Sequence, residues 1–333
     1  RSNPATTLLA DGKVLVAGGY NSVPLTSLLP ELYDPVANAW TETSPMTAPV
    51  VAPAAVRLKD GRVLFIGGHW GWPPTNVVQL FDPVSGDWLL AAPMQAGRIA
   101  PAVLLNSGGV LVVGGSAALG CHASAEIYNA TTNAWSSAGQ MSTPRGGHSI
   151  TVLPNEKVLA VGGSNCNGSP LSSAEVYDPV SNSWSAVSSM NTARYDHTAT
   201  PLPNGQVLIA GGADPSGTTL PTAELYDSIA DHWTPVGSMA TARQQHGAAL
   251  VGGTVLVAGV LTQQSGQPYT VQSSAELFNP SSNTWSATGT MIAPQYNDEL
   301  TVLLSGNVLV TGGLTDSIYS LPGPELYWPL NPT

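Results

Sequence analysis

Residues 14–20 read VLVAGGY, and six later stretches repeat this short apolar run followed by glycine. The later copies read FIGG, VVGG, AVGG, IAGG, VAGV and VTGG. The first glycines of the seven copies stand at positions 18, 67, 114, 162, 211, 259 and 312, so the spacings are 49, 47, 48, 49, 48 and 53 residues. Self-similarity at such a period is typical of repeat folds. The sequence therefore predicts seven copies of one structural unit.

Each unit carries the same elements after its glycines. A Glu-apolar-aromatic triplet follows, as at residues 126–128, although the second unit reads Gln-Leu-Phe at 79–81. A Trp then stands at positions 40, 88, 135, 184, 233 and 285, with a Met six residues later. The fourth unit divides into four short strands, near residues 148–153, 157–163, 174–178 and 182–186. Dipeptides such as Asp11-Gly12 accept positive φ at both central positions of a tight hairpin.

The composition excludes several classes of protein. Charged residues make up only 9% of the 333 residues and 43% are hydrophobic, so the chain is not a disordered acidic one. Ten Lys and Arg against 21 Asp and Glu give a formal charge of −11, so no nucleic-acid partner is expected. No apolar run approaches the roughly 20 residues that cross a bilayer, so no membrane insertion is expected.

The joint spacing of the Gly-Gly pair, the Glu-x-Tyr triplet and the Trp resembles the kelch repeat. The resemblance implies an all-β fold, a seven-bladed kelch β-propeller with four-stranded antiparallel blades, similar in architecture to WD40 propellers. The seventh unit has three clear strands; either residues 328–333 supply a poor fourth strand or the ring closes without one. A single domain is expected over residues 1–333, with repeat units at about 1–46, 47–94, 95–141, 142–190, 191–239, 240–291 and 292–333.

The scarcity of Lys and the abundance of Ser, Thr and Asn resemble secreted and bacterial members of this family. An extracellular or cell-surface location is therefore expected. The chain is expected to form a monomeric propeller, alone or within a larger precursor. Its partner is expected to be a protein or a glycan of unknown identity.

Arginine and glutamate recur together in the repeat. The second unit lacks both and has Val50 and Gln79 in these places, whereas the seventh has Gln295 with Glu325. The two positions fall at the same end of a blade, and the glycine pair between them leaves room for an Arg to reach across. Because buried charges are paired, we expect one structural ion pair in each Arg-bearing blade. The expected pairs are Arg1–Glu31, Arg98–Glu126, Arg145–Glu175, Arg194–Glu224 and Arg243–Glu276.

Three histidines and two cysteines invite a functional interpretation. His148, His197 and His246 follow an Arg by three residues in successive units, so they repeat with the fold and are interpreted as structural, with no metal site expected. Cys121 and Cys166 lie in equivalent loops of neighbouring units. They form either a disulfide between these loops or two free thiols.

Ligand binding is expected where the copies differ, because symmetry explains what they share. The second unit has an aromatic loop stiffened by proline, the sixth has an enlarged loop, and the fifth and seventh place polar and aromatic residues beside the Arg position. Loops on a rigid scaffold commonly carry binding. The candidate ligand-binding residues are His69, Trp70, Trp72, Tyr195, Asp196, Tyr269, Tyr296 and Asp298.

No catalytic residue or cofactor is predicted. The repeat pattern is similar to that of the propeller of galactose oxidase, whose copper site uses a Tyr cross-linked to a Cys, a Tyr directly followed by a His, and another His. The sequence contains no Tyr-His dipeptide and no G-x-S-x-G, P-loop or H-E-x-x-H motif. The favoured function is a non-catalytic binding module. The alternative is a kelch-type enzyme, a sugar oxidase or isomerase, with an axial pocket lined by the histidines and by Arg145, Arg194 and Arg243.

Overall fold

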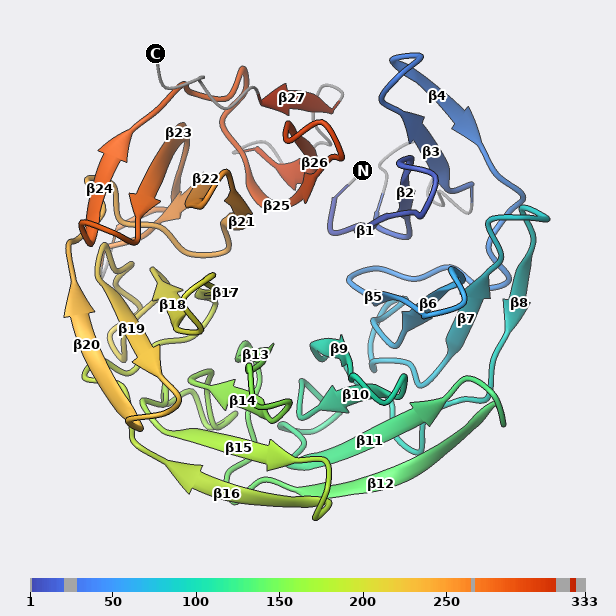
Figure 1. Ribbon diagram of the computed structural model, residues 1–333, viewed down its shortest axis with the longest axis horizontal. Coiled ribbons are helices and arrows are strands. Elements are labelled where there is room, and N and C mark those ends of the chain that lie inside the picture. The colour runs from blue at the N-terminus through green and yellow to red at the C-terminus, as the bar shows by residue number, and fades with distance from the viewer. Residues whose placement is uncertain (1, 21–28, 265–266, 316–323, 328–333) are drawn as a thin grey trace.

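The computed structural model describes residues 2–20, 29–264, 267–315 and 324–327, and within them the fold is all β (Figure 1). The described strands form seven antiparallel sheets arranged in a ring. Six sheets have four strands, and the seventh has three in the described residues. The prediction of a seven-bladed propeller with one incomplete blade is confirmed. Within these ranges, no helix is long and apolar enough to cross a membrane.

The blades follow one another in chain order, and each pairs its strands in sequence. Blades 1 and 2 comprise β1 (Ala5–Leu8), β2 (Val14–Ala17), β3 (Glu31–Asp34), β4 (Ala39–Glu42), β5 (Ala54–Arg57), β6 (Val63–Ile66), β7 (Val78–Phe81) and β8 (Trp88–Leu90). Blades 3 and 4 comprise β9 (Ala102–Leu104), β10 (Val110–Val113), β11 (Ser124–Asn129), β12 (Ala134–Gln140), β13 (Ser149–Val152), β14 (Val158–Val161), β15 (Ala174–Asp178) and β16 (Ser183–Val187).

The remaining blades continue the same order. Blades 5 and 6 comprise β17 (Thr198–Pro201), β18 (Val207–Ala210), β19 (Ala223–Asp227), β20 (His232–Val236), β21 (Gly247–Val251), β22 (Thr254–Thr262), β23 (Thr270–Asn279) and β24 (Thr284–Ala287). Blade 7 comprises β25 (Tyr296–Val302), β26 (Val308–Leu314) and β27 (Glu325–Tyr327). The first strand of each blade lies nearest the centre of the ring, and the fourth lies at its outside (Figure 1).

The second strand of a blade is buried on both faces. All four residues of β2, β6, β10, β14 and β18 are buried. These strands read as continuous apolar runs because each sheet is packed between two neighbouring blades. One apolar cluster, for example, joins Leu64 and Ile66 of blade 2 to Val110 and Val112 of blade 3.

The aromatic residues of the repeat pair across the third and fourth strands. Tyr128 lies opposite Trp135 with ring centroids 5.2 Å apart, and equivalent aromatic pairs in the other four-stranded blades lie at 4.7 to 5.3 Å. The Trp135 Nε1–H also donates to the carbonyl of Ala92, which precedes blade 3. The aromatic repeat therefore joins neighbouring blades as well as the two outer strands of one blade.

The glycine pair has a different role from the one expected. The N–H of Gly68 donates to the carbonyl of Arg98 in the next blade at 3.0 Å, and equivalent bonds recur between the following blades. Gly67 has a φ of +61°, and a Cβ there would lie 2.3 Å from the Arg98 carbonyl oxygen. The glycines therefore leave room for the main chain of the following blade rather than for the side chain of their own Arg.

The hairpin between the first two strands also differs from the expected two-residue turn. At Asp11-Gly12 only the glycine has a positive φ, +86°. The Gly12 N–H donates to the Leu9 carbonyl, and the Leu9 N–H donates to that of Lys13. This is a three-residue loop in which a type I turn is followed by a left-handed glycine, so the prediction of positive φ at both positions is wrong.

The ring closes by packing between blade 7 and blade 1. The Oγ1 atoms of Thr6 and Thr301 are hydrogen-bonded at 3.0 Å. Val14 of β2 shares an apolar cluster with Leu309 of β26. The described residues of these two blades therefore meet as other neighbouring blades do. The segment considered for a fourth strand, residues 328–333, lies outside the described residues.

Candidate functional site

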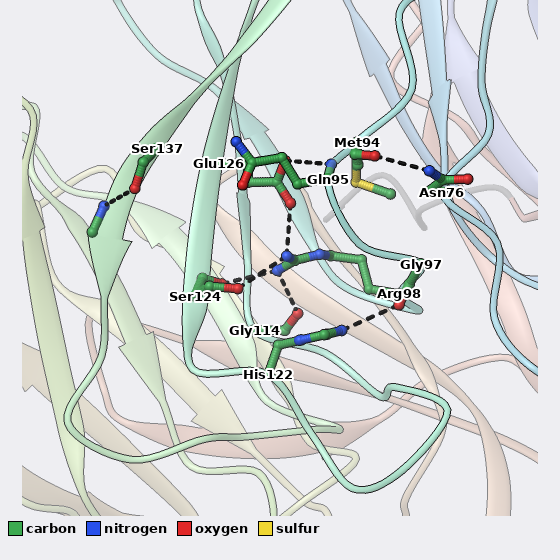
Figure 2. Close-up of polar contacts among 11 residues, drawn as sticks. Asn76, Met94, Gln95, Gly97, Arg98, Gly114, His122, Ser124, Glu126 and Ser137 are labelled. Atoms are coloured by element: carbon green, nitrogen blue, oxygen red, sulfur yellow. Dashed lines mark hydrogen bonds and ion pairs between the residues drawn. The ribbon is translucent and has the colours of Figure 1, made fainter.

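The guanidinium of Arg98 is enclosed by its own blade (Figure 2). Its Nη1 donates to the carbonyls of Gly114 at 3.0 Å and Ser124 at 2.9 Å. Its Nη2 donates to Ser124 Oγ at 3.0 Å and to Glu126 Oε1 at 2.7 Å. The second carboxylate oxygen of Glu126 accepts from the N–H of Gln95 at 2.9 Å. Both Nη atoms of Arg98 and both carboxylate oxygens of Glu126 are therefore bonded to protein groups, whereas the Arg98 Nε is buried without a partner.

The same arrangement recurs in three more blades. Each of the four arginines is at most 1% exposed. Burial lowers the pKa of each guanidinium and the partner carboxylate opposes that shift, so the side chain stays charged and paired. Arg1 lies outside the described residues. The further Nη2–Oε1 distances are 2.9 Å for Arg145–Glu175, 3.1 Å for Arg194–Glu224 and 2.6 Å for Arg243–Glu276.

These pairs rule out part of the enzyme alternative. An axial pocket lined by arginines would need guanidinium groups that solvent or substrate can reach. The structure instead buries Arg98, Arg145, Arg194 and Arg243 inside blades 3 to 6. The arginines therefore stabilise single blades, and the expectation that they line an axial pocket is wrong.

The buried histidines join successive blades. The Nε2 atom of His197 is hydrogen-bonded to Ser149 Oγ of the preceding blade at 2.8 Å, and His246 Nε2 makes the same contact with Thr198 Oγ1 at 3.0 Å. Burial, reinforced by the nearby arginines, lowers the pKa of His148 and of His197 to about 3. The imidazoles of His197 and His246 therefore hydrogen-bond to the first strands of the preceding blades, in accordance with a structural role.

Cys121 and Cys166 are joined in a disulfide, with their Cα atoms 5.5 Å apart. The bond links the loop after β10 in blade 3 to the loop after β14 in blade 4. Of the two alternatives that the sequence left open, the structure has the disulfide. It ties neighbouring blades at the face that carries the candidate ligand loops.

A cavity of about 460 Å³ lies between the loops of blades 5, 6 and 7. Three tyrosines line it, and the most accessible of them, Tyr269, is 56% exposed. Its polar lining is provided by Asp196 together with two glutamines, one of which donates from Nε2 to Asp196 Oδ2 at 2.8 Å. The lining residues that matter for recognition are Tyr195, Asp196, Gln244, Gln245, Tyr269 and Tyr296.

Burial shifts the pKa values of Tyr195 and Asp196 in this cavity. It raises the pKa of Tyr195, and the neighbouring Asp196 carboxylate adds to the shift, so the phenol keeps its proton at neutral pH. Burial also raises the pKa of Asp196, against the hydrogen bond from Gln245. The cavity therefore presents neutral hydroxyl donors beside amide and carboxyl acceptors.

Asp298 lies in a second, smaller cavity. This axial cavity has a volume of about 240 Å³ and is lined by residues at the starts of first strands, among them Gln245, Asp298 and Glu299. Asp298 and Glu299 both line this cavity, and Asp298 is buried whereas Glu299 is exposed. Burial, with a contribution from Glu299, raises the pKa of Asp298 to about 8.

The second blade has a third cavity where other blades hold their Arg–Glu pair. Val50 and Gln79 replace the pair, and a cavity of about 450 Å³ is lined by both, by Gly67 and by Trp70. The Gln79 Oε1 accepts from the N–H of Ala48 at 2.9 Å. The short Val50 side chain leaves the space of the missing guanidinium unfilled.

The predicted ligand residues thus divide into separate groups. Tyr195, Asp196, Tyr269 and Tyr296 come together in the tyrosine-lined cavity, whereas Asp298 faces the axial cavity. The blade 2 cavity is lined by Trp70 but not by His69 or Trp72. Trp72 is 64% exposed, and the Nδ1 atom of His69 contacts the Gly71 carbonyl at 3.1 Å.

Sequence reasoning missed two residues of the tyrosine-lined cavity, Gln244 and Gln245. They occupy the same register positions in blade 6 as Tyr195 and Asp196 in blade 5, directly after the buried Arg. Equivalent positions of neighbouring blades face the same region of the ring. Their place in the repeat could therefore have identified Gln244 and Gln245 as neighbours of Tyr195 and Asp196.

Comparison with known proteins supports the fold. The sequence matches the Kelch motif over residues 52–95 and 144–191, and the chain is a kelch-repeat β-propeller. A fungal alcohol oxidase of the AA5 family in complex with copper has a similar structure, with a TM-score of 0.75 and 16% identity over 95% of this chain and 71% of that one. The structure of YjhT is also similar, with a TM-score of 0.67 and 14% identity over 86% of this chain and 97% of that one.

These identities are low enough that the structural likeness shows the fold alone. No curated protein sequence matches the chain. The alcohol oxidase and this chain therefore share an architecture, and any shared chemistry must be argued from the side chains.

The residues present do not fit a copper site of the oxidase type. In the part of the chain that the structure describes, no group of three or more His, Cys, Asp or Glu is placed to hold a metal ion. His197 and His246 each bond to a hydroxyl of the preceding blade. Cys121 and Cys166 are bonded to each other, so neither is available for a link to a tyrosine.

Proposed function

We propose that this propeller is a non-catalytic binding module that holds a glycan in the tyrosine-lined cavity between blades 5, 6 and 7. The observation that carries the proposal is the cavity itself, about 460 Å³ in volume, with tyrosines and polar side chains converging on it. Pockets of this size that combine aromatic walls with a few placed polar groups are typical ligand sites. A saccharide unit is of suitable size.

The chemistry of the lining suits a sugar. The rings of Tyr195 and Tyr269 offer apolar faces on which the C–H side of a pyranose packs. The amides of Gln244 and Gln245 offer both donors and acceptors to hydroxyl groups. Asp196 is held in place by Gln245 at 2.8 Å, so its free oxygen is fixed before a ligand arrives.

The location and assembly proposed with this function are those of an extracellular or cell-surface protein with a monomeric propeller. The disulfide between Cys121 and Cys166 supports the location, because such bonds persist in oxidising compartments. Labelling of free thiols in protein taken directly from its source would test it. Quantitative labelling without prior reduction would contradict an oxidising compartment.

The binding proposal is tested with a glycan array followed by calorimetric titration of the best ligand. We expect Tyr269→Ala to weaken binding at least about 10-fold, because stacking on an aromatic ring is a large share of a sugar's affinity. Tyr269 is 56% exposed, so its removal leaves the fold intact. Tyr195→Phe tests the hydroxyl alone.

Tyr20→Ala is the matched control, since Tyr20 is 41% exposed and lies in blade 1. It should leave the affinity unchanged. If no glycan binds and a protein is captured through the same tyrosines, the ligand is a protein rather than a glycan. Equal affinities for wild type and Tyr269→Ala would overturn the proposed site.

A further inference from the structure

We propose that the blade 2 cavity is a binding pocket for a guanidinium group, the side chain of an arginine presented by a polypeptide partner. This pocket is separate from the tyrosine-lined cavity, and the two have no lining residue in common. The proposal rests on an internal comparison, because four other blades show which ligand this location accommodates.

The repeat itself supplies the template for the pocket. In blade 3 the Arg98 guanidinium is held by four acceptors, namely the carbonyls of Gly114 and Ser124, the Ser124 hydroxyl and the Glu126 carboxylate (Figure 2). Blades 4 to 6 hold their arginines in the same way. The location is thus built to coordinate the planar fork of N–H donors that only a guanidinium presents.

Blade 2 keeps the two main-chain acceptors of this arrangement and lacks the cation. By register, Gly67 corresponds to Gly114, Val77 to Ser124 and Gln79 to Glu126. All three line the cavity. The main-chain carbonyls of Gly67 and Val77 therefore remain of the four acceptors, and Val50 in place of Arg leaves the cavity unfilled. The Gln79 Oε1 is held in place by Thr47 Oγ1 and by the Ala48 N–H, which both donate to it.

The pocket is also open to a ligand from outside. Trp70, 41% exposed, and the exposed Pro73 line it on the loop side. A guanidinium that entered past Trp70 could stack on the indole face, which favours cations. The net charge of −11 on the chain favours approach of a cationic partner. An arginine on a polypeptide reaches such a pocket on a long apolar stem, as the internal arginines do from their own backbone.

Binding is tested with three small probes titrated separately into the wild-type protein. The probes are N-acetyl-arginine methylamide, its lysine analogue and its neutral citrulline isostere. We expect the arginine probe to bind at least about 10-fold more tightly than either of the others, because only it combines positive charge with the planar fork. Equal binding of all three, or no binding of the arginine probe up to about 10 mM, would overturn the proposal.

The location of the binding site is tested by restoring the Arg–Glu pair of the repeat in blade 2. The double variant Val50→Arg with Gln79→Glu fills the cavity from within, so we expect the arginine probe to lose at least about 10-fold in affinity. The variant recreates a pair that four blades already carry, so it should fold, and a raised melting temperature would verify the new pair. Probe binding that survives in a folded double variant would place the site elsewhere and contradict the proposal.

Two further experiments test whether the arginine is recognised within a polypeptide and whether the Trp70 indole contributes to binding. A short Gly-Ser-Arg-Ser-Gly peptide should bind as the blocked arginine does; failure of the peptide alone would contradict a polypeptide partner. Trp70→Ala should weaken the probe about 3-fold or more, by the usual size of a cation–π contact. Trp72→Ala is the matched control, because Trp72 lies in the same loop but does not line the pocket. Glycan binding should be unchanged in all of these variants.

Discussion

Removal of Arg98 should destabilise the propeller far more than removal of an exposed arginine. In the variant Arg98→Val, the Glu126 carboxylate stays buried at 3% exposure and keeps only the main-chain donor from Gln95. The carbonyls of Gly114 and Ser124 lose their guanidinium partner as well. Breaking a buried pair by deleting one partner costs about 3–5 kcal/mol of the free energy of unfolding.

The neighbouring blade indicates how this loss can be offset. Blade 2 carries Val50 and Gln79 in these two positions, and Gln79 accepts from the main-chain N–H of Ala48. Arg98→Val combined with Glu126→Gln should therefore lose less than the single variant, because no uncompensated charge remains. We expect the recovery to be about 1–3 kcal/mol, the usual coupling between directly bonded residues.

The assay is urea unfolding followed by tryptophan fluorescence, with the disulfide kept oxidised. Arg62→Ala is the control, since Arg62 and its partner Asp60 are 33% and 47% exposed and such pairs contribute at most about 1 kcal/mol. The reasoning is refuted if Arg98→Val costs no more than Arg62→Ala. It is also refuted if the double variant is less stable than the single one.

Three further outcomes follow from the structure. Because unfolded Asp298 ionises near pH 4 and the folded one near pH 8, the contribution of Asp298 to stability should fall by about 5 kcal/mol as pH rises between these values. The measurement is the difference in pH-dependent unfolding between wild type and Asp298→Asn. The buried histidines have the opposite effect on stability. Below about pH 6.5 the unfolded chain binds protons at these residues before the folded one does, so the free energy of unfolding falls as the pH falls. Stability should therefore be highest near pH 6.5. Reduction of Cys121–Cys166, which lie 45 positions apart in the sequence, should lower stability by up to about 4 kcal/mol in thermal melts; an unchanged melting temperature would contradict this. Gly211→Ala places a Cβ 2.3 Å from a carbonyl of the next blade and should cost more than Gly61→Ala, whose Cβ meets nothing within 4 Å; equal losses would refute a role between blades.

The sequence determined the architecture because its seven repeat units can be aligned with one another. Seven apolar runs at a period near 48 residues fixed the number of blades, and the pairing of Arg98 with Glu126 followed from their common end of the blade. The triplet and the Trp fixed the third and fourth strands. Such features recur once per unit, so each copy checks the others.

The tertiary structure decided what occurs only once. Whether Tyr195, Tyr269 and Tyr296 share one cavity depends on the paths of three loops from three blades, and no local preference encodes that convergence. Asp298 was grouped with these tyrosines from sequence as a candidate ligand residue, and the structure places it in a separate cavity.

The substitution of Val50 and Gln79 was visible in the sequence as a missing pair, and only the structure showed that the vacated space is a cavity. The physical reason is that periodic burial is a property of each strand, which residue order encodes directly. A cavity is a property of side-chain volumes from several strands, and it exists only once the blades have closed around it.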